Sequence, residues 1–230
     1  MKGRDLREAR KRQGLTQQQA AQMLHVTQGY LSMLEREKRP VPEHLVNSFR
    51  DTYVLSPLTL PLQESSSWRG LDVSALAREV AAAGYPGFSY MATKPSRNPA
   101  EVLLAALTKD ELETRVAESL PWLVLTYHNM DWDWVVREAK VNDVTNRLGF
   151  AVMLARELAE KKQDDATTEK LQVVESRLRR SVLAREDTFC QERMTQAERQ
   201  WLKLKSSPEA RCWNVLSDLS PEHLTHSTNA

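Results

Sequence analysis

The residues of this chain best suited to binding another molecule lie between Leu15 and Arg39. This stretch is rich in glutamine, threonine and serine, and it ends with Lys38 and Arg39 as adjacent cations. Amides and hydroxyls form directional hydrogen bonds, and lysine and arginine are common partners of phosphate groups. Such a combination favours contact with nucleic acid over catalysis.

Two short helices would position these residues. Thr16 is a good N-cap, and Gln19 three residues later completes a capping box, so a helix is predicted from Gln17 to Leu24. Thr27 caps a second helix that runs from Gln28 to about Arg36. A basic helix precedes this pair and a basic turn follows it. The layout is that of a helix-turn-helix, which lays its second helix in the major groove of DNA.

An apolar core is predicted beneath the two helices. Ala20 and Ala21 are small where two helices must cross closely, and Pro42 opens a further helix. The core residues expected here are Leu6, Leu15, Leu24, Val26, Leu31, Leu34, Leu45 and Phe49.

Residues 3–55 resemble the Cro/C1-type helix-turn-helix family, which includes the phage repressors and the Xre-like regulators. The resemblance combines caps, small residues, core periodicity and charge at fixed spacing. It rests on Leu6, Arg10, Leu15, Thr16, Gln17, Ala21, Val26, Thr27, Gln28, Leu31, Leu34, Glu35, Lys38 and Arg39. It implies a five-helix-type helix-turn-helix head that binds double-stranded DNA.

The resemblance assigns base contacts to the second helix. Gln28 and Gly29 open this helix and Met33 lies one turn later, at positions that meet base edges in the family. Glutamine suits paired hydrogen bonds with adenine, whereas Met33 offers only apolar contact, for instance with a thymine methyl group. Gly29 lets the backbone approach the DNA, and Tyr30 and Ser32 are flanking candidates.

The resemblance also assigns phosphate contacts. Gln17 stands at a helix N-terminus, where its side chain and backbone N–H are expected to bind a phosphate. Thr27 at the start of the second helix, and Lys38 and Arg39 beyond its end, complete this set.

Four further positions bear on the framework of the head. Arg10 and Glu35 match a family pair that forms an internal salt bridge. His25 and Glu37 stand where the family usually has glycine. Histidine tolerates the left-handed backbone better than most residues, so the turn at His25 is expected to be intact. Glu37 adds negative charge near the expected phosphate contacts. Because it replaces a glycine, the course of the backbone after the second helix is not predicted.

Net charge is unevenly distributed along the 230 residues. Residues 1–40 hold nine lysines and arginines against four acidic residues, a net charge of +5, whereas the whole chain carries only +1. This asymmetry predicts that nucleic-acid contact is confined to the N-terminal end. Cys190 and Cys212 lack metal-ligand spacing, so no metal or cofactor is expected. No signal peptide or membrane-spanning run is recognisable, which predicts a cytoplasmic protein.

The apolar fraction of 41% suffices for a packed core, and its helical periodicity predicts an all-α fold. The expected organisation is a helix-turn-helix domain at 1–56, a linker at 57–70, a helical domain for dimerisation or partner binding at 71–219, and a polar tail at 220–230. Within the helical domain, helices are predicted at 99–107, at 109–120 with Thr108 as a possible cap, from Asp131 or Asp133, and at 167–205.

Two features of the helical domain carry alternative interpretations. An aromatic cluster is either a ligand pocket or partner surface, or, as we favour, a core between helices; it comprises Trp122, Tyr127, His128, Trp132 and Trp134. A polar face beside an apolar stripe is either a subunit contact or, as we favour, a solvated surface; it comprises Asn142, Asp143, Asn146 and Arg147. Gly149 within the same segment is expected to allow a neighbouring helix to approach closely.

Catalytic motifs are not recognisable. The segment 222–226 comes nearest to the HExxH zinc motif but lacks the glutamate between its histidines. The dipeptide Ala83-Gly84 resembles the cleavage site of self-cleaving repressors, but Ser119 lies in a helical context without a β pattern. We therefore predict a transcription regulator that is not an enzyme, expected to be a homodimeric repressor. The alternatives are an antitoxin or defence-system regulator that neutralises a toxin or effector protein, and a helical ligand sensor or enzyme with a DNA-binding head.

Overall fold

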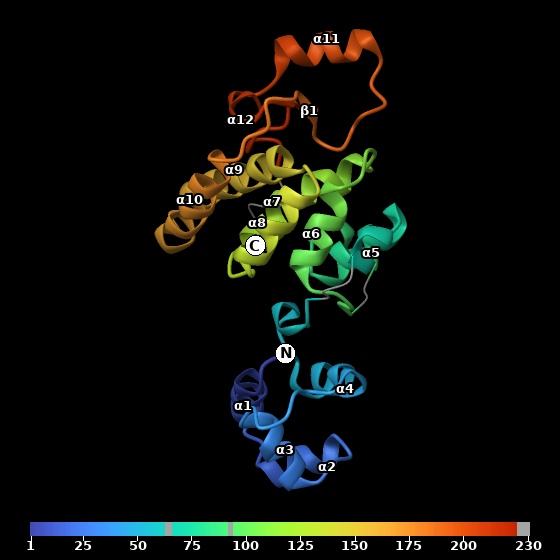
Figure 1. The fold of residues 1–230 in the computed structure, drawn as a ribbon, viewed down its shortest axis with the longest axis vertical. Coiled ribbons are helices and arrows are strands. Elements are labelled where there is room, and N and C mark those ends of the chain that lie inside the picture. The colour runs from blue at the N-terminus through green and yellow to red at the C-terminus, as the bar shows by residue number, and fades with distance from the viewer. Residues whose placement is uncertain (63–65, 92–93, 225–230) are drawn as a thin grey trace. The chain divides into compact units, whose positions relative to one another are not determined.

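The computed structural model describes residues 1–62, 66–91 and 94–224. These residues are helical apart from loops and two strands of two residues each, which confirms the predicted all-α class (Figure 1). The chain divides into two compact units, Met1–Pro61 and Leu62–Ala230. Residues 63–65 of the predicted linker and 225–230 of the predicted tail lie outside the described residues, as do 92–93.

The first unit, which we call the head, consists of four α-helices and a short 3-10 helix. These are α1 (Gly3–Arg12), α2 (Gln17–Met23), α3 (Gln28–Glu35), α4 (Glu43–Tyr53) and η1 (Pro57–Thr59). The predicted core is confirmed, with Leu15 and Val26 packed at its edge and Tyr53 as an added member. Ala20 and Ala21 are buried where α2 packs on its neighbours, as predicted.

The caps predicted for the two central helices are present. The Thr16 hydroxyl accepts a hydrogen bond from the Gln19 N–H at 3.2 Å, and the Gln19 side chain accepts one from the Thr16 N–H at 2.9 Å. The Thr27 hydroxyl accepts from the Tyr30 N–H at 3.2 Å. Each cap satisfies a donor that the first turn of a helix leaves unpaired, so both helix starts are determined locally.

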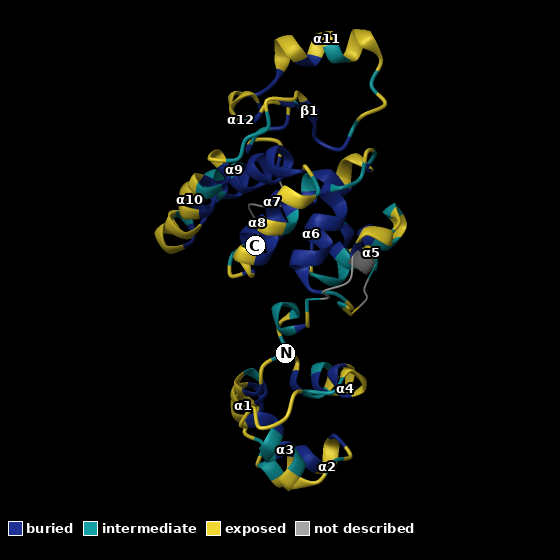
Figure 2. Cartoon of the chain, in the orientation of Figure 1, coloured by how far each residue is buried: buried dark blue, intermediate teal, exposed yellow. Residues whose placement is uncertain are grey.

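The second unit, which we call the body, is a helical assembly around α9. Its helices are η2 (Ser66–Gly70), α5 (Val73–Ala82), η3 (Pro86–Met91), α6 (Pro99–Leu107), α7 (Thr114–Thr126), α8 (Trp132–Val141), α9 (Thr145–Lys161), α10 (Asp165–Arg179), α11 (Gln196–Lys205) and α12 (Pro208–Cys212). Helix α9 packs against α7, α8, α10 and α12; α6 is buried throughout, and α9 is buried over most of its length (Figure 2).

The helix predicted at 167–205 is wrong, because α10 ends at Arg179. A loop follows, and within it β1 (Asp187–Thr188) pairs in parallel with β2 (Val215–Leu216). Asn146 holds this loop: its side-chain oxygen accepts from the Leu183 N–H at 2.8 Å and its amide donates to the Leu183 carbonyl at 2.9 Å. In a continuous helix the Leu183 N–H and carbonyl would bond to backbone groups four residues away. Here they bond to the Asn146 side chain instead.

The helix predicted at 109–120 is also shifted. Thr108 is the C-cap of α6 rather than an N-cap, and α7 begins only at Thr114. The intervening segment pairs with the loop after β1, where the Leu112 N–H donates to the Cys190 carbonyl at 2.9 Å. A tertiary hydrogen bond therefore determines where α7 can begin.

The polar face predicted to be solvated is buried at two of its four positions, which corrects that interpretation for Asn146 and Arg147, whereas Asp143 is exposed and Asn142 is half-buried. Asn146 and Arg147 are 0% and 4% exposed. The Arg147 guanidinium donates to Asp187 at 2.7 and 2.9 Å, to Glu192 at 2.8 Å, and to the carbonyls of Leu107 and Lys109 at 3.0 and 2.8 Å. Burial opposes its charge, but the hydrogen bonds to Asp187 and the negative charges of Asp187 and Glu192 together outweigh burial and hold the pKa of Arg147 above its usual value. Arg147 thus joins α6, α9 and the β1 loop.

Gly149 in α9 permits a close approach, but by a side chain rather than by a helix. A Cβ at this position would stand 2.2 Å from two carbons of the Trp213 ring, which is fully buried. The indole therefore occupies the space that any side chain at position 149 would need.

Replacing Gly149 with alanine is expected to destabilise the body, because overpacking against the buried Trp213 ring costs about 1–3 kcal/mol or more. The gain in helix propensity, about 1 kcal/mol, is too small to reverse the sign. Urea unfolding followed by tryptophan fluorescence measures the change. Gly70→Ala, where nothing lies within 4 Å of the added Cβ, is the matched control. Equal midpoints for the two variants would contradict the prediction.

Across the described ranges, the helices are too short or too polar to cross a bilayer.

Candidate nucleic-acid interface

The turn between α2 and α3 has the left-handed backbone that the sequence predicts. His25 adopts φ 54°, and the Val26 N–H donates to the Ala21 carbonyl at 2.9 Å to close the end of α2. The expectation of an intact turn at His25 is confirmed. Histidine here adopts the left-handed conformation that glycine provides in the family pattern.

The turn after α3 is also closed, although glutamate replaces glycine. Glu37 adopts φ 56°, and the Lys38 N–H donates to the Met33 carbonyl at 2.9 Å. The Glu37 carboxylate accepts a hydrogen bond of 3.4 Å from the Arg4 N–H in the first turn of α1. Negative charge is favourable at a helix N-terminus, so α1 engages the carboxylate that would otherwise repel phosphates.

The predicted ion pair between Arg10 and Glu35 is confirmed and is bidentate. Nε of Arg10 lies 2.6 Å from Oε1 of Glu35 and Nη2 lies 2.9 Å from Oε2, with both side chains buried. Burial tends to raise the pKa of Glu35, but hydrogen bonds from Arg10 and Gln17 outweigh it and lower that pKa. Nη1 of Arg10 also donates to the Leu15 carbonyl at 2.8 Å. The pair therefore ties α1 and the start of α2 to α3.

Gln17 has a different side-chain role from the predicted one. Its amide nitrogen donates to Oε2 of Glu35 at 2.9 Å, and the residue is half-buried. The side chain is therefore drawn into the buried ion pair. The backbone N–H of Gln17, at the N-terminus of α2, is the group left to meet a phosphate.

Helix α3 presents one outward face. Leu31, Leu34 and Glu35 are buried on its inner side, whereas Gln28 and Gly29 are exposed. The predicted base-contact residues divide accordingly. Gln28, Gly29, Ser32 and Met33 lie on or beside the outward face, and Tyr30 packs against the edge of the head core. A side chain placed at position 29 would meet nothing within 4 Å, so the backbone there is open to close approach.

Arg36 extends the outward face, although the sequence alone assigned it no role. It is exposed and immediately follows α3, at three residues from Met33 and seven from Gly29. This helical spacing is the signal that could have identified it. Arginine can form paired hydrogen bonds with guanine or bind a phosphate.

The remaining predicted phosphate contacts lie at the two ends of α3. Thr27 is exposed, with its hydroxyl oxygen bonded as the N-cap, and Lys38 and Arg39 are exposed beyond the Glu37 turn. Cations and a helix N-terminus thus border the outward face of α3, as the docking geometry of a helix-turn-helix requires.

The aromatic cluster is part of the body core, in agreement with the favoured of its two interpretations and against a ligand pocket or partner surface. Trp122 is 3% exposed and packs edge-on against Tyr85 and Tyr127, while Trp134 is buried against Trp68. Trp132 is half-buried, as are Tyr127 and His128, and its indole N–H donates to the His128 carbonyl at 2.9 Å. These rings serve packing between helices and leave the head as the candidate binding site.

A helix-turn-helix family model matches residues 6–46, which extend from within α1 to the first residues of α4. The match confirms the resemblance over this segment, and it identifies a helix-turn-helix domain of DNA-binding transcription regulators. Neither the curated proteins nor the solved structures contain a match to this chain.

Proposed function

We propose that this protein is a sequence-specific transcription regulator that binds a palindromic operator as a homodimer and represses its own operon. The observation that carries the proposal is the outward face of α3. Gln28, Gly29 and Met33 stand on a helix fixed by a buried ion pair and closed turns at both ends. A rigid helix with an accessible polar face is what base readout in the major groove needs.

The proposed dimer follows from the size of one head. A single head of this size buries limited surface and reads few base pairs, whereas operator-grade affinity generally needs two heads on two half-sites. We assign dimerisation or partner binding to the body, because it is larger than the head and forms a separate compact unit whose surface is available for a second protein.

A binding titration tests this proposal. The full chain is titrated onto duplex DNA from upstream of its own gene and onto a scrambled duplex, at two salt concentrations. We expect tight, selective binding to the first, with a two-fold symmetric footprint. Gln28→Ala should reduce that selectivity by about 10–100-fold, since a paired hydrogen bond to a base contributes about 1–3 kcal/mol of discrimination. Equal, weak binding to both duplexes by the wild-type chain would contradict the proposal.

A second candidate is an antitoxin or defence-system regulator whose body binds a protein partner. The observation favouring it is the outer face of α11, where Trp201 and Leu204 are 52% and 77% exposed and Ala197 is also exposed. Apolar residues spaced by four and three along a helix are typical of a helix that docks into a groove. Stable association with the product of the neighbouring gene, lost on Trp201→Ser, would support this role. A homodimer that never captures that product would count against it.

A further inference from the structure

Three of the five basic residues of α1 lie on one side of the helix. Arg4, Arg7 and Lys11 are separated by three and four residues, so they form a single stripe, and all three are exposed. No salt bridge engages them within the part of the chain that the structure describes. These three residues are called the α1 ridge below.

The α1 ridge borders the side of α1 that packs on α3. Gly3 lies against the Leu34 carbonyl, and Arg10 pairs with Glu35. Arg7 is four residues from Gly3 and three from Arg10, so it stands next to this row on the helix surface. Its charge is close enough to contribute to the lowered pKa of Glu35.

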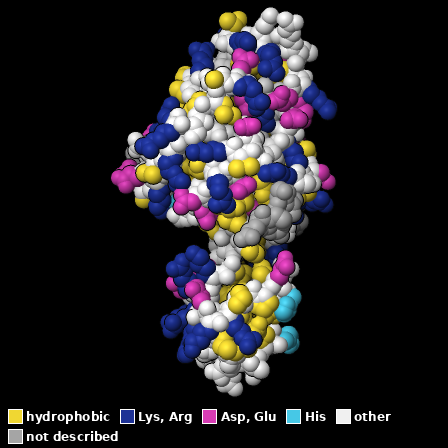
Figure 3. Space-filling model, in the orientation of Figure 1, with side chains coloured by type: hydrophobic (Ala, Val, Ile, Leu, Met, Phe, Trp, Pro, Cys, Tyr) yellow, Lys and Arg dark blue, Asp and Glu magenta, His cyan; other side chains and the backbone are white. Residues whose placement is uncertain are grey.

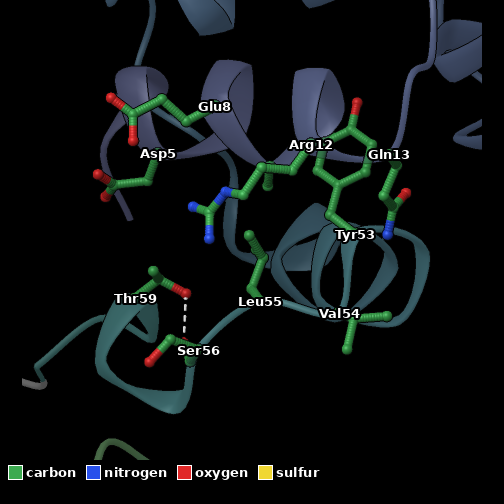
Figure 4. A pocket seen from close by; sticks show the side chains of 10 residues that line it. Asp5, Glu8, Arg12, Gln13, Tyr53, Val54, Leu55, Ser56 and Thr59 are labelled. Carbon is green, nitrogen blue, oxygen red and sulfur yellow. Dashed lines mark hydrogen bonds between the residues drawn. The ribbon is translucent and has the colours of Figure 1, made fainter.

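The other side of α1 has a different character. Asp5, Glu8 and Arg12 line a cavity of about 260 Å³ between α1 and the segment around η1 (Figure 4). These three side chains carry two negative charges and one positive charge, so this side of α1 has no excess of cations. The exposed cations Arg4, Arg7 and Lys11 lie on the side next to α3, where the Glu37 carboxylate contacts the Arg4 N–H.

The α1 ridge continues the basic border of α3. The first turn of α1 meets the turn after α3, where Arg4 donates its N–H to Glu37, and Lys38 and Arg39 follow directly. Lysine and arginine side chains gather over α1 in the surface view (Figure 3). Because Glu35 holds the Gln17 side chain, the cations beside this ion pair join the Gln17 backbone N–H as groups that can bind a phosphate at this edge.

We propose that Arg4, Arg7 and Lys11 form a second phosphate-binding edge, which contacts the DNA backbone beside the groove that α3 occupies. The ligand class is the phosphodiester backbone of duplex DNA, irrespective of base sequence. This inference rests on the proposed DNA-binding function. It assigns α1 a direct role in affinity, in addition to its role in supporting α3.

Salt dependence tests the α1 ridge. Arg7→Gln combined with Lys11→Gln is compared with Arg12→Gln, which removes a cation from the opposite side of the same helix. The probes are the upstream duplex and its scrambled counterpart. We expect the double variant to make the slope of log Kobs against log salt shallower by about 2, since each phosphate contact contributes about 0.9. Affinity for both duplexes should fall by the same factor.

The control separates this inference from the proposed function. Arg12→Gln should leave the slope unchanged, and circular dichroism should be the same for all variants because the substituted residues are exposed. If the wild type binds selectively and Gln28→Ala relaxes selectivity, but the double variant keeps the slope of Arg12→Gln, the α1 ridge is rejected and the regulator stands. If the wild type binds neither duplex at low salt, the proposed function and the ridge both fail.

Discussion

Replacing Arg147 with methionine is expected to lower the free energy of unfolding of the body by about 3–5 kcal/mol, the usual cost of removing one partner of a buried ion pair. Asp187 would be left as a buried carboxylate without its cation, since its Oδ1 accepts both bonds from Arg147. The carbonyls of Leu107 and Lys109 would each lose a donor as well. Methionine fills similar space, so lost charge pairing rather than a cavity is the cause.

Tryptophan fluorescence during urea unfolding measures this change. The six tryptophans, at positions 68, 122, 132, 134, 201 and 213, all belong to the body, so their emission reports on that unit alone. Arg177→Met is the matched control, because Arg177 pairs with Asp133 at an exposed site and should contribute at most about 1 kcal/mol. Similar midpoints for Arg147→Met and Arg177→Met would show that the buried network does not stabilise the body.

Replacing Arg10 with methionine is expected to abolish DNA binding by destabilising the head, again by about 3–5 kcal/mol. Glu35 would remain buried at the back of α3 without its paired cation, stabilised by the Gln17 hydrogen bond and the charge of Arg7. Binding to the upstream duplex should be lost while the tryptophan-detected unfolding midpoint stays at its wild-type value. A variant that binds DNA normally would show that the pair is dispensable.

Two companion variants define the cause. Arg12→Met removes an exposed arginine of the same helix and should leave the head intact. Arg10→Met combined with Glu35→Leu removes both charges, and part of the stability should return because no buried charge is left unpaired. If the double variant is as unstable as Arg10→Met alone, an uncompensated Glu35 is not the cause.

Acid should weaken the head through the same pair. The folded-state pKa of Glu35 is lowered, so its ionised form adds stability above the unfolded-state value of about 4.3. That contribution declines as the pH falls from there through the lower folded-state pKa. Circular dichroism of the wild type should therefore show loss of head structure in this acidic range.

Local sequence signals determined much of the head. Thr16 and Thr27 cap their helices by accepting hydrogen bonds from backbone N–H groups three residues away. His25 adopts the left-handed backbone conformation, which histidine tolerates better than most residues. The pairing of Arg10 with Glu35 followed from the family resemblance. Interactions over a few residues, or at positions fixed by a shared motif, can be read without knowing the rest of the fold.

Tertiary structure decided the environment of polar groups whose partners lie far along the chain. Arg147 has the spacing of a surface residue, yet Asp187, forty positions later, holds it inside the body. The helix predicted to continue to residue 205 ends at Arg179, and Asn146 binds the loop that follows. In the head, Glu35 engages Gln17 and α1 engages Glu37. Sequence periodicity specifies which face of a helix is apolar, but burial of a charge depends on whether packing brings it a partner, and only the fold supplies that partner.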